Sequence, residues 1–151
     1  MKYELGEELD GLFRIKALIN IGAVVKAGDI GGWVASEKNL SQEGTCWVYG
    51  DAKVFDNAVV SGNAVVSGGA WVFGYAVVYG NAVVYGDARV YGDARVYGDA
   101  RVYGDAWVFG KAVVFGNAVV SGDALVSGDA LVSGDARVYG DANVFGGTTL
   151  K

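Results

Sequence analysis

Side chains capable of catalysis are few in this chain of 151 residues, which has no histidine and a single cysteine, Cys46. Histidine is the usual general base near neutral pH and a common zinc ligand. Without it, neither a histidine-dependent acid–base site nor a three-histidine zinc site can be built. Cys46 stands where neighbouring segments have alanine, so we expect a small core residue rather than a nucleophile. We therefore predict no catalytic residue, no metal ligand and no cofactor.

Acidic side chains form the most regular set of charges. They recur at every eighteenth position, with Gly69 interrupting the series, at Asp51, Asp87, Asp105, Asp123 and Asp141. Such a column could bind a cation or imitate a phosphate backbone. Solvated aspartates that suit turns would explain it as well, and interspersed arginines dilute its charge. The net charge of −5 disfavours a broad grip on nucleic acid, so no direct nucleic-acid binding is expected.

A six-residue repeat positions these side chains. From Gly44 to Lys151 the chain divides into eighteen hexapeptides without a break, and valine stands at every sixth position from Val48 to Val144. A typical unit is Gly-Asp-Ala-Arg-Val-Tyr. The alternation of Ala, a variable residue, Val and an aromatic residue or Ser predicts a short strand. Gly followed by Asp or Asn predicts a corner, because these residues tolerate positive φ.

Two arrangements of such strands can be compared. In an antiparallel meander the apolar set would change sides at every turn, so no sheet face could be buried coherently. A parallel solenoid that always turns in one sense keeps every Ala and Val inward. Three hexapeptides per turn give 18-residue coils, about six of them, each stabilised by stacking on its neighbours. The repeat therefore predicts an all-β fold, a triangular parallel β-solenoid.

This pattern resembles the hexapeptide-repeat superfamily of left-handed parallel β-helices, which includes acyltransferases and γ-class carbonic anhydrases. The aliphatic first position, Asn or Asp at the fourth and a small residue at the fifth all match. The usual Gly at the second position is replaced by Tyr, Phe or Ser, with Gly at the third. With that departure the repeats are more similar to uncharacterised bacterial and prophage proteins of the YdcK-like group, as is the segment KAGDIGGWVASEKN at residues 26–39. The resemblance implies a left-handed coil, and the enzymes of this superfamily depend on histidine.

The first 43 residues depart from the repeat, and we expect an irregular N-terminal β cap over 1–43, distinct from the β-helix over 44–151. Two strands are predicted around a turn near Asp10-Gly11. Val34 and Leu40 already stand six residues apart, and two extra residues separate them from the register of Val48. A cap would cover unpaired strand edges; a partner-binding head is the alternative.

The C-terminal hexapeptides have no comparable cap. Three alternatives follow: Thr residues and Lys151 blunt the last coil, another chain covers it, or the chain has been cut short.

Stacking at the period of one coil sorts the outward side chains into three faces. The first face should carry a strip of rings with two tryptophans, and its candidate partner-binding residues are Phe55, Trp71, Phe73, Tyr91, Trp107, Phe109 and Phe145. Strand propensity and cross-strand ladders alone would explain these rings. Outward Val, Leu and Trp on every face, however, should expose more apolar surface than a monomer usually tolerates. We expect the first face to be an interface, since Trp and Tyr dominate interface energetics.

Together these features predict a non-enzymatic scaffold whose flat faces mediate self-assembly or protein binding, with a phage or prophage source implied by the resemblance. One alternative is an inhibitor of a host or defence protein that acts as an acidic nucleic-acid mimic. Another is a diverged acyltransferase-like protein without its histidine. The charged start and the lack of an 18-residue apolar run predict no signal peptide and no membrane span, hence a cytoplasmic protein.

Overall fold

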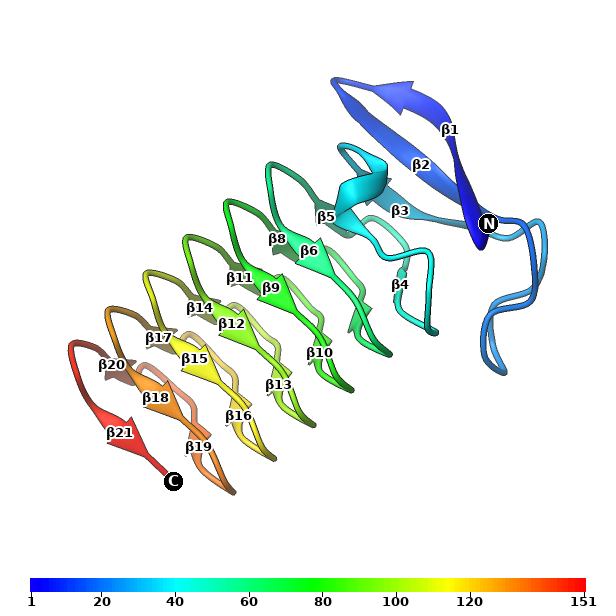
Figure 1. Cartoon of the computed structure of the whole chain (residues 1–151). Helices are drawn as coiled ribbons and strands as arrows, with labels where there is room; N and C mark the ends of the chain where they lie inside the picture. Colours follow the sequence, from blue (N-terminus) through cyan, green and yellow to red (C-terminus); the bar gives the residue numbers. More distant parts are fainter.

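The computed structural model describes the whole chain, residues 1–151, and consists almost entirely of short strands (Figure 1). Three longer strands come first, β1 (Tyr3–Leu9), β2 (Leu12–Ala17) and β3 (Ile30–Val34), followed by a 3-10 helix, η1 (Glu37–Asn39). The remaining strands have two residues each, one strand for each hexapeptide: β4 (Trp47–Val48), β5 (Lys53–Val54), β6 (Val59–Val60), β7 (Val65–Val66), β8 (Trp71–Val72), β9 (Val77–Val78), β10 (Val83–Val84), β11 (Arg89–Val90), β12 (Arg95–Val96), β13 (Arg101–Val102), β14 (Trp107–Val108), β15 (Val113–Val114), β16 (Val119–Val120), β17 (Leu125–Val126), β18 (Leu131–Val132), β19 (Arg137–Val138), β20 (Asn143–Val144) and β21 (Thr149–Leu150).

Parallel pairing of every third strand closes the chain into a three-sided coil (Figure 1). The first face is the sheet β3-β5-β8-β11-β14-β17-β20, which β2 and β1 extend at one edge. The second face is β6-β9-β12-β15-β18-β21, and the third face is β4-β7-β10-β13-β16-β19. Within the repeat, each residue pairs with its equivalent three hexapeptides along the chain, as Val65 does with Val83. The predicted parallel β-solenoid with 18-residue coils is therefore confirmed.

Small apolar side chains fill the inside of the coils. The inward alanines and the valines at every sixth position, from Ala52 to Val132, are fully buried, while the aromatic residue or serine that follows each of these valines lies on the outer side of the coil. Val90, for example, has no exposed surface, whereas Tyr91 lies half-buried on the first face. A coil this narrow has room for one Ala and one Val per strand, which is why the repeat tolerates variation only at outward positions.

Glycine suits the corners for two reasons, its backbone conformation and the close approach of the next coil. Its φ is positive, +67° at Gly86, in the left-handed region that other residues avoid. A Cβ on Gly86 would also lie 3.0 Å from the backbone nitrogen of Gly104 in the next coil. The corner backbones are bonded from coil to coil, since the amide of Asp87 donates to the carbonyl of Gly104 at 2.8 Å. The glycine repeat thus sets both the bend and the close spacing of the coils.

The first coil starts before the perfect repeat. β3 pairs in parallel with β5, so that Val34 lies beside Val54, and Leu40 bridges Val60. In both pairs the two residues are two positions further apart in the sequence than one coil of the repeat. This confirms the two extra residues predicted between Leu40 and Val48. With β3 the first face has seven coil strands, and the solenoid has about seven turns rather than the six predicted for 44–151 alone. The division of the chain at residue 43 stays a prediction, because coil pairing continues back to β3.

The N-terminal strands form an antiparallel hairpin on the edge of the first face (Figure 1). Its turn is at Asp10 and Gly11, both with positive φ, as the sequence predicts. Tyr3 and Ile15 of the hairpin are fully buried and belong to the same continuous core as the coil valines. The N-terminal strands therefore cover the apolar end of the coil stack.

No helix of this structure could cross a membrane, since its only helical segment is the three-residue η1.

A candidate interaction surface on the first face

Four rings form a continuous stack along the first face. Phe55, Phe73, Tyr91 and Phe109 follow one another with centroids 4.9, 4.8 and 5.0 Å apart and planes within 5° of parallel. The spacing is that of neighbouring strands in a sheet, about 4.8 Å, so coil pitch and ring stacking coincide. Each ring shields the faces of its neighbours and leaves its edge outward, and the four edges together form a flat apolar strip.

A second column beside the rings alternates tryptophan with cations. Trp71 lies between Lys53, whose ammonium is 5.3 Å from the ring centroid, and Arg89, whose guanidinium is 4.3 Å away. Trp33 precedes Lys53 in this column, because the two residues pair across β3 and β5, and Arg14 stacks on its ring at 4.5 Å. Trp107 follows Arg89 in register. Each cation therefore lies beside the electron-rich face of an indole, where the contact contributes about 0.5–1 kcal/mol at an exposed site.

The two columns also contact each other. Trp71 meets Phe55 edge-on at 5.9 Å, and Trp107 meets Tyr91 edge-on at 6.1 Å. Burial raises the pKa of the Tyr91 hydroxyl, and the nearby Arg89 cation partly opposes that shift. The hydroxyl therefore stays neutral at physiological pH, and the charges of this surface are those of its arginine and lysine side chains.

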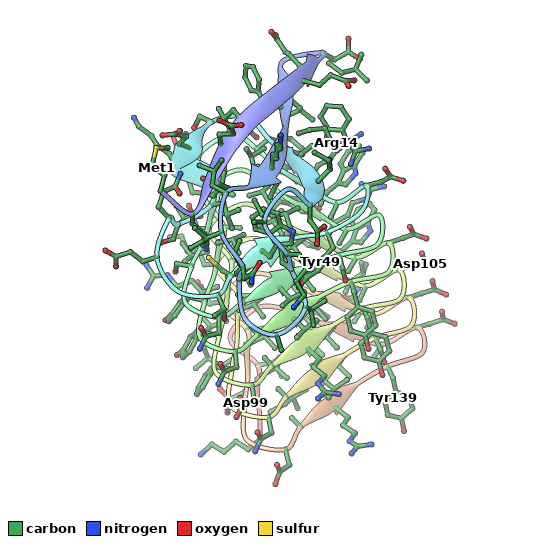
Figure 2. The ribbon with its side chains drawn as sticks, turned by 90° about the vertical axis from the view of Figure 1, so that its right-hand side faces the viewer. Met1, Arg14, Tyr49, Asp99, Asp105 and Tyr139 are labelled. Atoms are coloured by element: carbon green, nitrogen blue, oxygen red, sulfur yellow. The ribbon has the colours of Figure 1, made fainter.

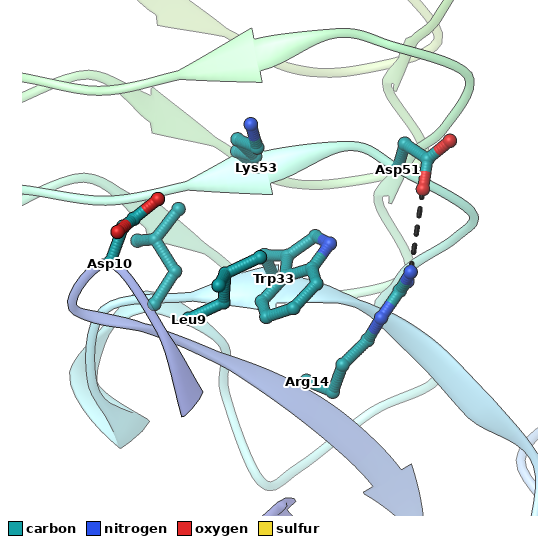
Figure 3. A pocket seen from close by; sticks show the side chains of 7 residues that line it. Leu9, Asp10, Arg14, Trp33, Asp51 and Lys53 are labelled. Carbon is teal, nitrogen blue, oxygen red and sulfur yellow. Dashed lines mark hydrogen bonds and ion pairs between the residues drawn. The ribbon is translucent and has the colours of Figure 1, made fainter. Parts of the chain in front are cut away.

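The hairpin overhangs the upper end of this surface and leaves a cleft of about 290 Å³ (Figure 3). Leu9, Asp10 and Leu12 come from the hairpin, and Trp33, Asp51 and Lys53 from the first coils, with Arg14 between the two groups. In Figure 3 the indole of Trp33 lies at the centre, with Leu9 and Arg14 on either side of it. The cleft is thus half apolar and half charged.

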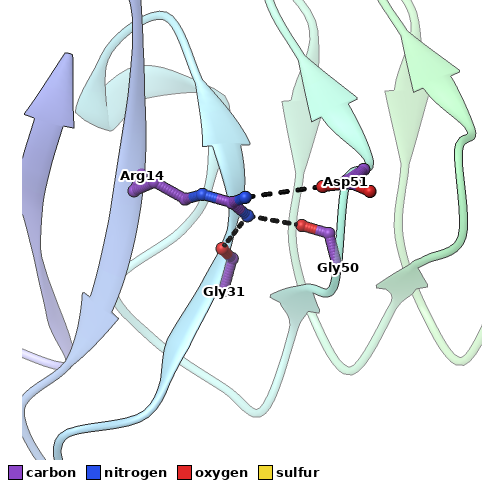
Figure 4. A network of polar contacts seen from close by, with 4 residues as sticks. All are labelled: Arg14, Gly31, Gly50 and Asp51. Atoms are coloured by element: carbon purple, nitrogen blue, oxygen red, sulfur yellow. Dashed lines mark hydrogen bonds and ion pairs between the residues drawn. The ribbon is translucent and has the colours of Figure 1, made fainter. Parts of the chain in front are cut away.

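Arg14 attaches the hairpin to the coils (Figure 4). Its Nη1 donates to the carbonyl oxygens of Gly31 and Gly50, at 3.0 and 2.7 Å, and its Nη2 lies 3.4 Å from Oδ1 of Asp51. The two carbonyl contacts hold the guanidinium against the ring of Trp33. The Asp51 contact adds little on its own, because that carboxylate is largely exposed.

The YdcK β-solenoid repeat family model matches residues 76–92, 88–102, 94–110 and 124–140. These matches lie within the hexapeptide coils and include Tyr91, Trp107 and Phe109 of the first face. The coils over these residues are YdcK-like β-solenoid repeats. This agrees with the predicted resemblance and with the coil that the structure shows. No curated protein matches the chain.

The YdcK-like coils bring together six of the seven residues predicted for partner binding. The exception is Phe145, because Ser127 interrupts the ring column between Phe109 and Phe145. Phe145 is consequently 62% exposed, whereas the stacked rings are half-buried. Trp107 is 39% exposed and the most open indole of this face, while Trp71 lies under its cations. Whether these residues bind a partner stays a prediction.

Sequence reasoning placed Lys53 in the column of Trp71 but missed two members of this surface, Trp33 and Arg14. Trp33 pairs with Lys53, and the two residues are two positions further apart than one coil of the repeat. The coil period alone therefore does not align them, but the two extra residues noted after Leu40 would have predicted the pairing. No signal in the sequence points to Arg14, because its contacts depend on how the hairpin folds over the first coil.

The acidic column lies at the corner that joins the third face to the first. Asp51, Asp87, Asp105, Asp123 and Asp141 are all exposed, and Figure 2 shows Asp105 pointing away from the coils. Only Asp51 has a charged partner, Arg14. No group of three or more His, Cys, Asp or Glu side chains converges to hold a metal ion. A role for this column in binding stays a prediction.

Cys46 is fully buried, as expected for a residue in the small inward position. Its sulfur lies 3.3 Å from the Nζ of Lys2, which also donates to the Cys46 carbonyl at 2.9 Å. Lys2 is itself almost completely buried. The thiol therefore belongs to the packing between the N-terminal strand and the first coils.

Proposed function

We propose that this YdcK-like protein is a non-enzymatic scaffold whose first face associates with the first face of a second copy. The observation that carries the proposal is the flat strip of stacked rings and indoles along that face, with Trp107 still 39% exposed. Rigid rings held in register lose little side-chain entropy on association, and Trp and Tyr contribute most to interface energies.

The alternation of indole and cation favours a second copy over an unrelated partner. A two-fold axis that lies in the plane between the two faces, perpendicular to the coil axis, would place the column Lys53-Trp71-Arg89-Trp107 of one copy opposite and antiparallel to the same column of the other. Trp107 could then face a cation of the second copy, just as Trp71 lies between Lys53 and Arg89 within one chain. Such a contact is self-complementary, and it would remove Trp107 from water.

A non-enzymatic role is supported by the side chains available. The chain has no histidine to act as a general base, and its only thiol is buried in the N-terminal packing. We infer a left-handed coil and a phage or prophage source as part of this proposal, on the strength of the resemblance. A cytoplasmic location is part of the same proposal, and the single free thiol of Cys46 is compatible with it.

Sedimentation velocity over a range of concentrations tests the proposal. The protein should sediment as an oligomer that dissociates on dilution, and Trp71→Ala with Trp107→Ala should shift dissociation to concentrations at least about tenfold higher. The matched control is Tyr79→Ala with Tyr97→Ala, which removes two stacked rings from the second face and should leave association unchanged.

Two results would overturn the proposal. A protein that is monomeric at the highest concentration would favour a different partner protein. Equal association of both double variants would show that the first face is not the interface. Circular dichroism of each variant verifies that the coils remain folded, and calorimetry with acetyl-CoA tests the acyltransferase alternative, which measurable binding would favour.

A further inference from the structure

The ring columns on all three faces are interrupted in the same coil. Serine replaces the aromatic residue there at Ser121 on the third face, Ser127 on the first and Ser133 on the second. Two further serines stand in these columns in the early coils, Ser61 on the second face and Ser67 on the third. Between the serines the rings stack directly, as do Tyr85 and Tyr103 on the third face, whose centroids are 4.7 Å apart with planes 10° from parallel. Each serine therefore leaves out one ring from a regular stack.

Only the gap at Ser121 is a groove. Tyr103 and Tyr139 lie one coil above and one coil below Ser121, and with Val119 and Arg137 they line a hollow of about 350 Å³. Tyr139 is 70% exposed, because Ser121 leaves one side of its ring uncovered and no further coil covers the other side, and Figure 2 shows it on the outside of the last coils. The two tyrosines are two coil steps apart, roughly 9.6 Å at the usual strand spacing. That separation admits one planar ring at normal stacking distance from each tyrosine.

The other two gaps differ in their neighbours. The residue beside Ser127 is Leu125, and the residue beside Ser133 is Leu131, whereas the residue beside Ser121 is the shorter Val119. Ser133 is also buried, and its hydroxyl donates to the carbonyl oxygen of Leu150. Among these three gaps, the small floor and the free tyrosine face thus coincide only at Ser121. Ser67, higher in the same column, also lies beside a valine, Val65, but no hollow forms there.

The one charged side chain that lines the groove is a cation. Arg137 lines it, and Arg101 occupies the same outward column two coils away, with Val119 between them. Neither arginine forms an ion pair, since the only salt bridge of the structure joins Arg14 and Asp51. Aspartates stand at the corners on both sides, Asp123 after Ser121 and Asp99 and Asp135 before the arginines, but none of them lines the groove, so the cation available to an anion there is Arg137.

We propose that this groove binds a small planar aromatic anion, with its ring between Tyr103 and Tyr139 and its carboxylate or phosphate at Arg137. The ring replaces the one that Ser121 omits from the column, and aromatic stacking on both tyrosines supplies most of the affinity. The guanidinium supplies a charge-assisted hydrogen bond to the anion. This site is on a different face from the proposed association surface and does not depend on it.

Titration with 2-naphthoate, followed by two-dimensional NMR of the backbone amides, tests the proposal. We expect saturable shifts centred on Val119 and Ser121, with a dissociation constant on the order of 1 mM, as ligand efficiency predicts for a probe of this size. Ser121→Tyr puts a ring into the gap and should weaken binding at least about tenfold. Ser127→Tyr, the same change in the same coil on the first face, should leave binding unaltered.

Two further measurements distinguish the contribution of ring stacking to binding from the contribution of charge. Arg137→Gln should weaken 2-naphthoate about threefold to tenfold and leave the neutral 2-naphthamide unchanged. Cyclohexanecarboxylate, an anion without a planar ring, should bind at least about tenfold more weakly than 2-naphthoate. The proposal is wrong if 2-naphthoate causes no shifts at about 10 mM, a concentration roughly tenfold above the expected dissociation constant. It is equally wrong if the shifts map elsewhere, or if Ser121→Tyr binds as well as the unmodified protein.

Discussion

The N-terminal cap and the repeated coils bury their apolar surface in different ways. The coils do so with identical Ala and Val layers and backbone hydrogen bonds from each coil to the next. The cap uses large and polar side chains, each in a contact of its own. Tyr3 packs edge-on against Trp47 at 6.2 Å, and buried Lys2 and Asn39 bond to the backbone of segments far away in the chain.

The difference shows where specificity resides in this molecule. A coil layer can stack on any other coil layer, so nothing in the repeat itself determines where the stack begins. The cap has contacts that occur once, and they define the starting register of the coils. Stability along the coils should accordingly be a sum of similar steps, whereas the cap should behave as one cooperative unit.

Val90→Asp should have the largest effect, because it places a carboxylate at a fully buried position in the middle of the stack. An unpaired buried charge costs about 4 kcal/mol or more of unfolding free energy. Ile15→Asp, at an equally buried position in the cap, should unfold the hairpin and leave the distant coils protected. Amide hydrogen exchange distinguishes the two outcomes, and loss of protection around Val114 in Ile15→Asp would contradict the separation of cap and coils.

Asn39→Ala should destabilise the protein by about 2–4 kcal/mol, as measured by urea unfolding. The Asn39 side chain accepts from the amides of Ala35 and Ser36 and donates to the carbonyls of Asp56 and Ala58, all within 3.2 Å. The alanine variant leaves these buried groups without partners.

Asn81→Ala is the matched control for Asn39→Ala, because it removes the same side chain from a position in the repeat. Asn81 belongs to a ladder of corner side chains and donates to Asp99 at 3.3 Å, but both residues are exposed. Water replaces such a bond, so the expected loss is about 0.5 kcal/mol or less. Equal losses in the two variants would show that the cap is no more specific than the coils.

Gly86→Ala should cost about 1–3 kcal/mol, because the new methyl group meets both a positive φ and the backbone of the next coil, 3.0 Å away. Gly140→Ala has a similar φ, +60°, but no atom lies within 4 Å of the added group. The difference between their midpoints in thermal unfolding measures the contact between coils separately from backbone strain. If the two variants melt alike, coil spacing does not require glycine.

Ser67→Tyr should have the smallest effect and the opposite sign. Ser67 interrupts the third-face column between Tyr49 and Tyr85, and a ring there would extend the stack that continues through Tyr103. Two added aromatic contacts should stabilise the protein by about 0.5–1 kcal/mol. A lower unfolding midpoint would show that Tyr49, whose burial raises its hydroxyl pKa, already fills the space beside Ser67.

Most of the coil geometry could be predicted, because nearly every hexapeptide has the same pattern of a corner followed by a short strand with inward Ala and Val. Gly at every corner, Val at every sixth position and the two-residue offset after Leu40 together predict strand positions, pairing and the three faces. The candidate surface was predictable to the same extent, since Phe55, Phe73, Tyr91 and Phe109 stack through the coil period alone.

The unpredicted features all involve the cap or a difference in exposure. Arg14 reaches Gly50 across 36 positions in the chain, and Lys2 reaches Cys46 across 44, without any periodic signal. Trp71 and Trp107 are equivalent in the repeat, but cations cover one and leave the other more open. Such inequalities depend on which side chains occupy the neighbouring coils.

The sequence by itself determined the solenoid, its 18-residue coil and the side chains on each face, because a short repeat with one apolar side has a single way to bury that side completely. Only the tertiary structure decided how the hairpin covers the first coil, which cleft it forms over Trp33, and which serine gap is a groove. Those features arise from unique contacts between distant residues, and a local, periodic preference carries no information about them.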